Sequence, residues 1–220
     1  MKPTGAHGKR NAAELIIESI AEVFAEKGYE GARVDELAAA AGVNKATLYY
    51  QVGDKEALYH AVLEQVFRHT ADQIEAAVAT CEDCEEQIRE YVRVFAHTAG
   101  NLGYAAPILL REVASGGSNL SHGAIDQMGR ILGALTGSLA CGTQQGRFRP
   151  VNSFMVHMMI IGSLSFYAAN EPIRRRIAEH HPDISEPKHF LSHEEAGHQI
   201  ADLILAAIRA PAVNNHKEQQ

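Results

Sequence analysis

Two short helices joined by a tight turn are encoded in Ala41-Gly42-Val43-Asn44-Lys45-Ala46-Thr47-Leu48-Tyr49-Tyr50-Gln51. Gly42 tolerates the positive φ that a tight turn needs. Val43 is the next apolar residue and fills the angle between the helices. Asn44 is placed to cap the N-terminus of the second helix. We therefore expect one helix over 34–41, ending at Gly42, and another over 45–51.

The second helix has an inner and an outer face. The inner residues of the pair pack on the chain's first helix and comprise Leu37, Ala38, Ala41, Val43 and Leu48. The outer residues are Lys45, Ala46, Thr47, Tyr49, Tyr50 and Gln51. An amine, a hydroxyl, two phenols and an amide can contact base edges and phosphates. This pattern predicts a DNA-reading face.

The rest of the chain also has helical patterning. Apolar residues recur at three- and four-residue steps over 11–27, and Gly28 follows at the C′ position. Asp54 can cap a long helix that runs to about Ala79. Strand-type alternation is missing, so the predicted class is all-α. Further helices are expected near 85–98, 104–114, 120–145, 153–170 and 194–209, with loops at 115–119, 146–150 and 180–188.

The segments Gly28-Tyr29-Glu30-Gly31-Ala32-Arg33-Val34-Asp35-Glu36-Leu37-Ala38 and Ala41-Gly42-Val43-Asn44-Lys45-Ala46-Thr47-Leu48-Tyr49-Tyr50-Gln51-Val52-Gly53-Asp54-Lys55-Glu56-Ala57-Leu58 carry a family signature. They closely resemble the DNA-binding domain of the TetR (tetracycline-repressor-like) regulators. The resemblance covers about residues 11–66. Two departures stand out: the family commonly has His-Phe where this chain has Gln51-Val52, and often Thr or Ser near Arg33 to cap the preceding helix.

The resemblance implies an all-α protein with an N-terminal three-helix, helix-turn-helix DNA-binding domain over 11–56. A helical ligand-binding and dimerisation domain would occupy 57–210. The ends would be a flexible basic tail over 1–10 and a frayed tail over 211–220. The protein would be a transcriptional regulator, most simply a homodimeric repressor released from operator DNA by a small molecule, with activation as the alternative.

The DNA contacts implied by the resemblance fall on the helix over 45–51. The residues at base or groove positions are Lys45, Ala46 and Thr47. Those at phosphate and sugar positions are Tyr49, Tyr50 and Gln51. Lys55 would meet a phosphate beside a helix N-terminus. Arg33 lies close to this face and completes the expected set.

The net charge of −7 argues against DNA binding unless the charges are segregated. Residues 1–60 carry seven Lys or Arg and nine Asp or Glu, which gives 7 − 9 = −2. Four of the acids form a separate stripe on the first helix, namely Glu14, Glu18, Glu22 and Glu26. The basic residues in the tail or near the reading face are Lys2, Lys9, Arg10, Arg33, Lys45 and Lys55. We therefore expect a locally positive field at that face.

Dimerisation is expected from the geometry of DNA, because one short helix reads only a few base pairs. Two such helices about 34 Å apart meet successive major grooves on one side of a duplex, so the operator should be near-palindromic. The segment 153–170 is apolar on nearly every side. By resemblance, it and the helix over 194–209 form the dimer interface.

A pocket for the effector is expected among the helices from Glu85 onward, with the helix over 54–79 as a lever. Candidate lining residues put polar tips or adaptable walls into an apolar cavity. They are His97, Asn101, Tyr104, Arg111, Met128, His157, Met158 and Tyr167.

Two other residue groups suggest different chemistry. Cys81 and Cys84 form a C-x-x-C that would suit a redox- or metal-responsive DNA-binding sensor, although a plain turn is favoured because the intervening acids raise thiol pKa values. A histidine-rich group could suggest a metal site, but its spacing favours a solvated surface. It comprises His180, His181, His189, His193 and His198, with Glu194 and Glu195. We predict no metal and no cofactor.

The remaining function classes find little support. No nucleophile–base spacing, phosphate loop or paired carboxylates appear, so no catalytic residue and no enzyme activity is predicted. No apolar run reaches the 18 to 20 residues or so that span a bilayer. The basic, Gly-rich start lacks an apolar signal region, and three cysteines suit a reducing compartment. We expect a cytoplasmic protein without membrane contact.

Overall fold

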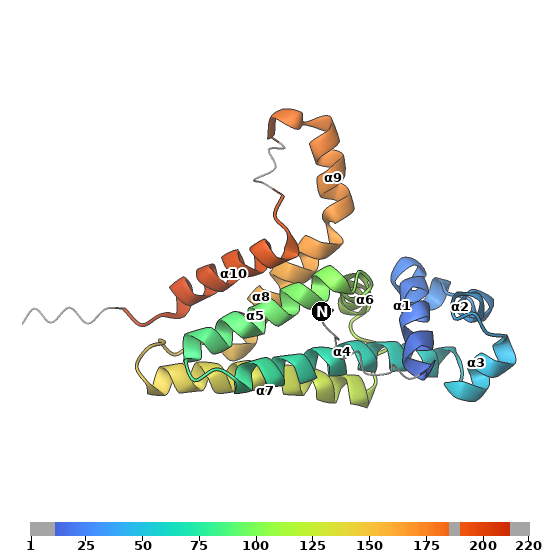
Figure 1. Ribbon diagram of the computed structural model, residues 1–220, viewed down its shortest axis with the longest axis horizontal. Helices are drawn as coiled ribbons and strands as arrows, with labels where there is room; N and C mark the ends of the chain where they lie inside the picture. Colours follow the sequence, from blue (N-terminus) through green and yellow to red (C-terminus); the bar gives the residue numbers. More distant parts are fainter. Residues whose placement is uncertain (1–11, 185–189, 212–220) are drawn as a thin grey trace, which may run out of the picture. The chain divides into compact units, whose positions relative to one another are not determined.

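The computed structural model describes residues 12–184 and 190–211, and Figure 1 shows its helices. Within these ranges the fold is all-α, as predicted, and contains no strand. The helices are α1 (Ala12–Gly31), α2 (Val34–Ala40), α3 (Lys45–Gln51), α4 (Lys55–Ala79), α5 (Cys84–Asn101), α6 (Ala105–Ala114), α7 (His122–Gln144), α8 (Ser153–Ala169), α9 (Glu171–His180) and α10 (His193–Ile208), with a 3-10 turn, η1 (Pro182–Ile184). The predicted tail over 1–10 and nearly all of that over 211–220 lie outside the described residues.

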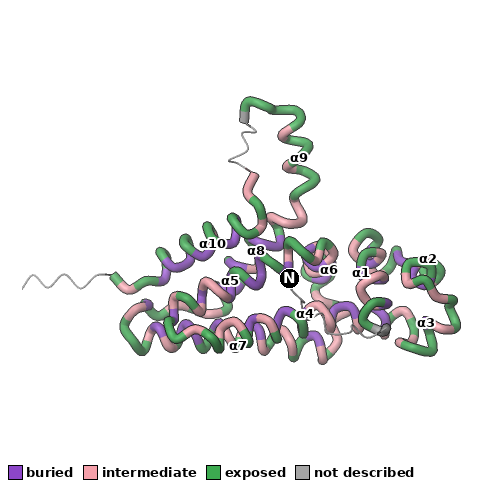
Figure 2. The backbone as a smooth tube through the Cα atoms, viewed as in Figure 1, coloured by how far each residue is buried: buried purple, intermediate pink, exposed green. Residues whose placement is uncertain are grey.

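The chain forms two compact units, each with its own core. The first unit comprises residues 1–69 and 101–128, and the second comprises 70–100 and 129–220. Figure 2 shows buried positions along the helices of both. Fully buried side chains of the first unit include Ile20, Phe24, Leu37, Leu48 and Leu58. Those of the second include Ile74, Ile88, Tyr91, Leu135 and Leu205.

The end of α1 is held by α6. Gly28 has φ 71° and ψ 174°, so the helix is interrupted at the glycine that the sequence placed at C′, and one further turn runs to Gly31. The guanidinium of Arg111 on α6 donates to the carbonyl oxygens of Ala25 at 3.1 Å and Glu26 at 2.8 Å. These carbonyls would otherwise lack partners at a helix end, so the arginine side chain fixes α1 to α6.

A buried carboxylate joins α4 to α6 within the first unit. Glu112 is 3% exposed and accepts a hydrogen bond of 2.7 Å from the hydroxyl of Tyr59. It also accepts from the backbone and side-chain nitrogens of Asn119, at 3.3 and 3.1 Å. Burial, followed by the hydrogen bond to this carboxylate, raises the pKa of Tyr59 above its usual value. The charge is tolerated because several donors satisfy it.

The second unit contains a buried polar pair. The hydroxyl of Tyr91 on α5 lies 2.8 Å from Nδ1 of His157 on α8, and the ring of Phe95 lies 6.0 Å from the imidazole. Burial lowers the pKa of His157, so the imidazole is neutral at pH 7. The pair links α5 to α8 without a buried charge.

Helix α9 is an element that the sequence analysis did not assign. Its segment begins Glu171-Pro172, which suits the first helical turn. Its only large apolar residues are Ile173 and Ile177, and most of the others are charged. None of its residues is buried, as Figure 2 shows. A periodic apolar stripe was therefore too weak to reveal it.

The structure confirms the helix caps that the sequence predicted for α4 and α10. Asp54 caps α4 by accepting from the backbone of Ala57 at 2.9 Å, and Ser192 with Glu195 forms the expected capping box of α10. The loop expected over 180–188 in fact begins after α9, and its later part lies outside the described residues. Across the described helices, none is both long and apolar enough to cross a bilayer.

Replacing Tyr59 by Phe tests the buried carboxylate. Loss of the hydroxyl leaves Glu112 with one donor fewer in a buried setting, so the free energy of unfolding should fall by about 1–3 kcal/mol. Urea unfolding followed by circular dichroism measures it. Tyr49→Phe, at an exposed position, is the control and should change stability by less than about 0.5 kcal/mol. Equal stabilities of the two variants would contradict this account.

Candidate nucleic-acid interface

The turn between α2 and α3 is closed by backbone hydrogen bonds around a left-handed glycine. Gly42 has φ 67°, and its N–H donates to the carbonyl of Ala39 at 3.1 Å. The N–H of Val43 donates to the carbonyl of Ala38 at 3.0 Å. The chain therefore reverses in four residues and enters α3 at a fixed angle.

Helix α3 is anchored from one side and at one end. The side-chain oxygen of Asn44 accepts a 2.8 Å hydrogen bond from the backbone N–H of Thr47, which is the predicted cap. Leu48 on α3 and Leu37 on α2 are fully buried. These contacts fix the rotation of α3 about its own axis, so they decide which residues face outward.

The outward face of α3 is the one that the sequence predicted. Tyr50 is 91% exposed and Tyr49 is 45% exposed, whereas Thr47 is half-buried beside the cap. Lys45, Ala46 and Gln51 are also exposed. A solvent-facing phenol on a rigid helix is free to contact a phosphate or a base edge without unfolding anything.

The cations near α3 already have partners, which sequence reasoning missed. The Lys45 ammonium lies 2.5 Å from the carboxylate of Asp35, one helix away. Lys55 donates to the carbonyl of Glu30 at 3.3 Å and lies 4.7 Å from the centre of the Tyr29 ring. The Lys45–Asp35 ion pair and the Lys55–Tyr29 cation–π contact are both solvent-accessible and weak. A phosphate can therefore compete for these lysine side chains.

The start of α2 shows how the chain manages without the usual Thr or Ser cap. Arg33 is exposed and occupies the N-cap position without capping through its side chain. The carboxylate of Glu36 instead accepts from the backbone N–H of Arg33 at 3.2 Å and from Lys27 at 2.6 Å. The hydrogen bond from Lys27 holds the pKa of Glu36 below its usual value. This leaves the Arg33 guanidinium on the surface.

The eight effector candidates fall into both units. Asn101, Tyr104, Arg111 and Met128 belong to the first, and His97, His157, Met158 and Tyr167 to the second. Arg111 is engaged with α1, as described above. His157 is buried against Tyr91, whereas His97 and Met158 are exposed. The hydroxyl of Tyr167 donates to the carbonyl of Leu191 at 2.7 Å, and the Arg174 guanidinium lies 3.7 Å from its ring centre.

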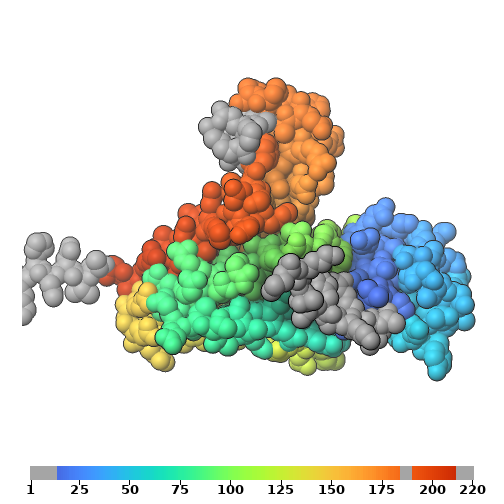
Figure 3. Space-filling view, in the orientation of Figure 1, coloured from blue at the N-terminus to red at the C-terminus, as the bar shows by residue number. Residues whose placement is uncertain are grey.

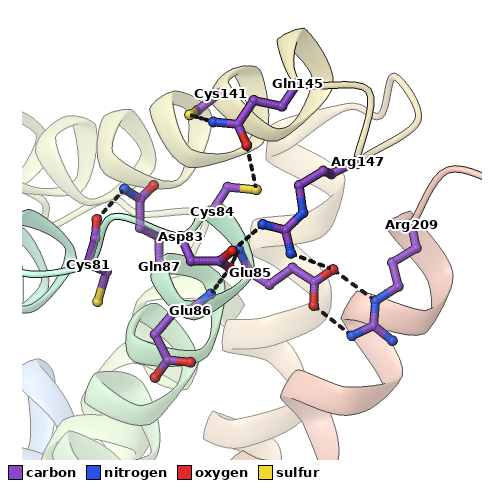
Figure 4. Close-up of polar contacts among 10 residues, drawn as sticks. All are labelled: Cys81, Asp83, Cys84, Glu85, Glu86, Gln87, Cys141, Gln145, Arg147 and Arg209. Atoms are coloured by element: carbon purple, nitrogen blue, oxygen red, sulfur yellow. Dashed lines mark hydrogen bonds and ion pairs between the residues drawn. The ribbon is translucent and has the colours of Figure 1, made fainter.

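The two cysteines of the C-x-x-C face different neighbours (Figure 4). The thiol of Cys81 donates to the carbonyl of Ala77 at 3.4 Å, while Cys84 is fully buried and lies 3.8 Å from the side-chain oxygen of Gln145. Burial is the main cause that raises the pKa of Cys84, ahead of nearby charges. A protonated, buried thiol is a poor nucleophile, so nothing in this geometry favours a redox sensor.

The contacts around Cys84 are hydrogen bonds and ion pairs that link the start of α5 to other parts of the second unit. Asp83 caps α5 by accepting from the backbone of Glu85 at 2.8 Å, and Arg147 also donates to Asp83. Glu85 in turn accepts from Arg209 at 3.1 and 2.7 Å (Figure 4). Three segments far apart in the sequence meet here. The described residues contain no cluster of three or more metal-ligating side chains.

A tight helix-turn-helix with an exposed, polar second helix, at the start of an all-helical chain, defines a DNA-binding transcriptional regulator. The sequence profile described as "Bacterial regulatory proteins, tetR family" matches residues 16–62, which contain this motif. The TetR family is therefore the family that the N-terminal part of this chain matches.

Known relatives and structures agree with this assignment. The HTH-type transcriptional regulator RutR of Escherichia coli strain K12 is 25% identical over 174 residues, which cover 78% of this chain and 82% of RutR. The TetR-family regulator PfmR of Thermus thermophilus shares 25% identity with a TM-score of 0.62, over 87% of this chain and 97% of PfmR. FadR of Bacillus subtilis, solved with stearoyl-CoA, gives a TM-score of 0.70 at 19% identity over 89% and 99% of the two chains. These relatives are regulators, not enzymes.

Gly42→Ala tests whether the turn depends on backbone conformation. A Cβ built at Gly42 meets nothing within 4 Å, so the only penalty is the positive φ, and we expect a loss of about 1 kcal/mol in unfolding free energy. Gly129→Ala in α7 is the matched control, since its Cβ is equally unhindered but its backbone is helical. That variant should gain about 0.5–1 kcal/mol. Opposite signs in urea unfolding are expected, and equal signs would contradict the argument.

Proposed function

We propose that the chain acts in the cytoplasm as a homodimeric repressor that a small-molecule effector releases from a near-palindromic operator. The observation that carries this proposal is the outer face of α3, where polar side chains stand exposed on a helix held rigidly by Leu48 and the Asn44 cap. The proposed DNA contacts are Arg33, Lys45, Ala46, Thr47, Tyr49, Tyr50, Gln51 and Lys55.

The length of α3 supports a dimer on DNA. Seven residues at about 1.5 Å each give a helix of about 10 Å, which reaches only a few base pairs. Two copies related by a twofold axis and about 34 Å apart would read two half-sites in successive major grooves. Lys45 would exchange Asp35 for a phosphate on binding, because phosphate contacts release counterions and carry much of the affinity.

The surface of α8 supports the same conclusion. Four large apolar side chains of this helix are about half or more exposed, namely Phe154, Met155, Met159 and Phe166. Leu203 on α10, which packs beside α8, is 66% exposed. Monomeric proteins rarely leave such contiguous apolar surface open. We propose that α8 and α10 pair with the same helices of a second copy, as an isologous interface requires.

The helices from α5 onward would provide the effector site. The B. subtilis FadR structure, which has a similar fold, holds stearoyl-CoA. A cavity among the helices after α4 is therefore proposed for this chain, and the candidates for it within the second unit are His97, His157, Met158 and Tyr167. Ligand binding would act through a change in spacing of the two α3 helices, because only a difference in affinity between two states can couple the sites.

Thr47→Ala and Tyr50→Ala test the reading face on DNA selected from a random pool. Each should weaken operator binding by about 1–3 kcal/mol, seen as a shift in a fluorescence anisotropy titration. The wild-type affinity should also fall steeply with salt. Glu22→Gln, on the exposed side of α1, is the control and should bind as the wild type does. Wild-type affinity in both test variants would refute the placement of α3 in the groove.

A charge placed on α8 tests the dimer. Met159→Glu and Phe166→Glu would each bury a carboxylate in the proposed interface, so sedimentation at micromolar concentration should show monomers. Val113→Glu, at a 70% exposed apolar position on α6, is the matched control and should remain dimeric. Dimers in all three variants would place the interface elsewhere.

A further inference from the structure

A cavity of about 470 Å³ lies in the second unit, between α9 and the residues that lead into α10. This volume falls in the range of sites for small molecules. Figure 3 shows α9 in orange beside the red surface of α10. The lining residues are Glu171, Arg174, Arg175, Ala178, Phe190, Leu191 and His193. Tyr167, one of the effector candidates, contacts this lining through Leu191 and Arg174.

The charges of the lining favour an anion. Two guanidinium groups face one carboxylate, and Glu171 is paired with Arg175 at 2.7 Å. Arg174 stacks on the Tyr167 ring and donates to the Tyr167 carbonyl oxygen. An arginine has five donors in a fixed fork, so this contact orients Arg174 and leaves donors for a ligand. The cavity therefore presents a positioned positive group.

His193, which also lines the cavity, carries an unsatisfied polar atom. Its Nε2 is buried without a hydrogen-bond partner, and among the described side chains only Thr98 has another such atom. The imidazole is fixed between Gly100, whose Cβ would lie 3.1 Å from it, and the Tyr167 ring, which it meets edge-on at 6.1 Å. A buried nitrogen without a partner is costly, so a hydrogen bond to a ligand oxygen would be favourable once a shift of the ring exposes Nε2 to the cavity.

We propose that this cavity binds a small molecule with an oxyanion group, a carboxylate or a phosphate, on an apolar body. Arg174, Arg175 and His193 would hold the oxyanion, while Ala178, Phe190 and Leu191 would contact the body. Taking this molecule as the effector rests on the proposed function, because the cavity lies between α9 and the start of α10, one of the helices of the proposed dimer interface. The binding itself does not depend on that function.

Helix α9 supplies its own matched control. The cavity residues Glu171, Arg174, Arg175 and Ala178 are spaced by three and four, so they share one face. Arg176 lies away from that face and is exposed. Arg176→Gln therefore removes the same charge from the same helix without touching the cavity.

The test measures binding of 2-naphthoate to the full-length protein by its fluorescence and by calorimetry. We expect saturable binding, no binding of the neutral isostere 2-naphthamide, and a loss of at least about tenfold in Arg174→Gln/Arg175→Gln. Arg176→Gln should stay within about twofold of the wild type.

The double variant could misfold, because Arg174 packs on Tyr167. In that case the test rests on Arg175→Gln alone and on the comparison of naphthoate with naphthamide on the wild type. 2-Naphthyl phosphate distinguishes the two oxyanions, and tighter binding by either supports the proposal.

Three results would overturn the proposal: no saturable binding of either anion, equal binding of the amide, or equal losses in the Arg175 and Arg176 variants. Operator binding, measured in parallel, separates the two ideas. A protein that binds operator but not these anions disproves the cavity and leaves the proposed function standing. A protein that binds the anions but no DNA disproves the proposed function and leaves the cavity.

Discussion

The outer face of α3 depends on the burial of two leucines across a four-residue turn. Leu37 and Leu48 are fully buried, and burying such a side chain is worth about 1.5–3 kcal/mol. Because Gly42 takes a positive φ and Asn44 caps the next turn, the helices can meet at the angle that this burial requires. The exposed phenols are therefore a result of packing on the opposite side.

The first unit extends beyond the three-helix motif because polar contacts attach α6 to it. Arg111 completes the end of α1, and its neighbour Glu112 accepts from Tyr59 on α4. Adjacent residues on one helix thus hold two others, one through backbone carbonyls and one through a buried carboxylate. Any shift of α6 along its axis would break directional hydrogen bonds, whereas apolar contacts could slide.

Sequence reasoning could predict the fold class, the motif and its caps, because each depends on neighbours within about four residues. Gly42, Asn44, Asp54 and the Ser192 capping box are of this kind. It could not predict the Lys45–Asp35 pair or the role of Arg111, since these join residues of different helices. The DNA and effector contacts stay predictions, because they depend on molecules beyond the chain. Helix α9 was missed for a different reason: it buries nothing, so no apolar period marks it.

The lack of buried residues in α9 bears on how this helix is stabilised. A helix that buries no side chain gains little from packing, and ten residues are too few for stability in isolation. Its polar contacts include those of Arg174 with Tyr167 and of Arg175 with Glu171, the second an exposed pair of the kind that adds little stability alone. Both arginines line the cavity beside His193. The two arginines that contact Tyr167 and Glu171 are thus also the ones that the proposed anion would engage. An anion that binds only when α9 is ordered would stabilise this helix by mass action.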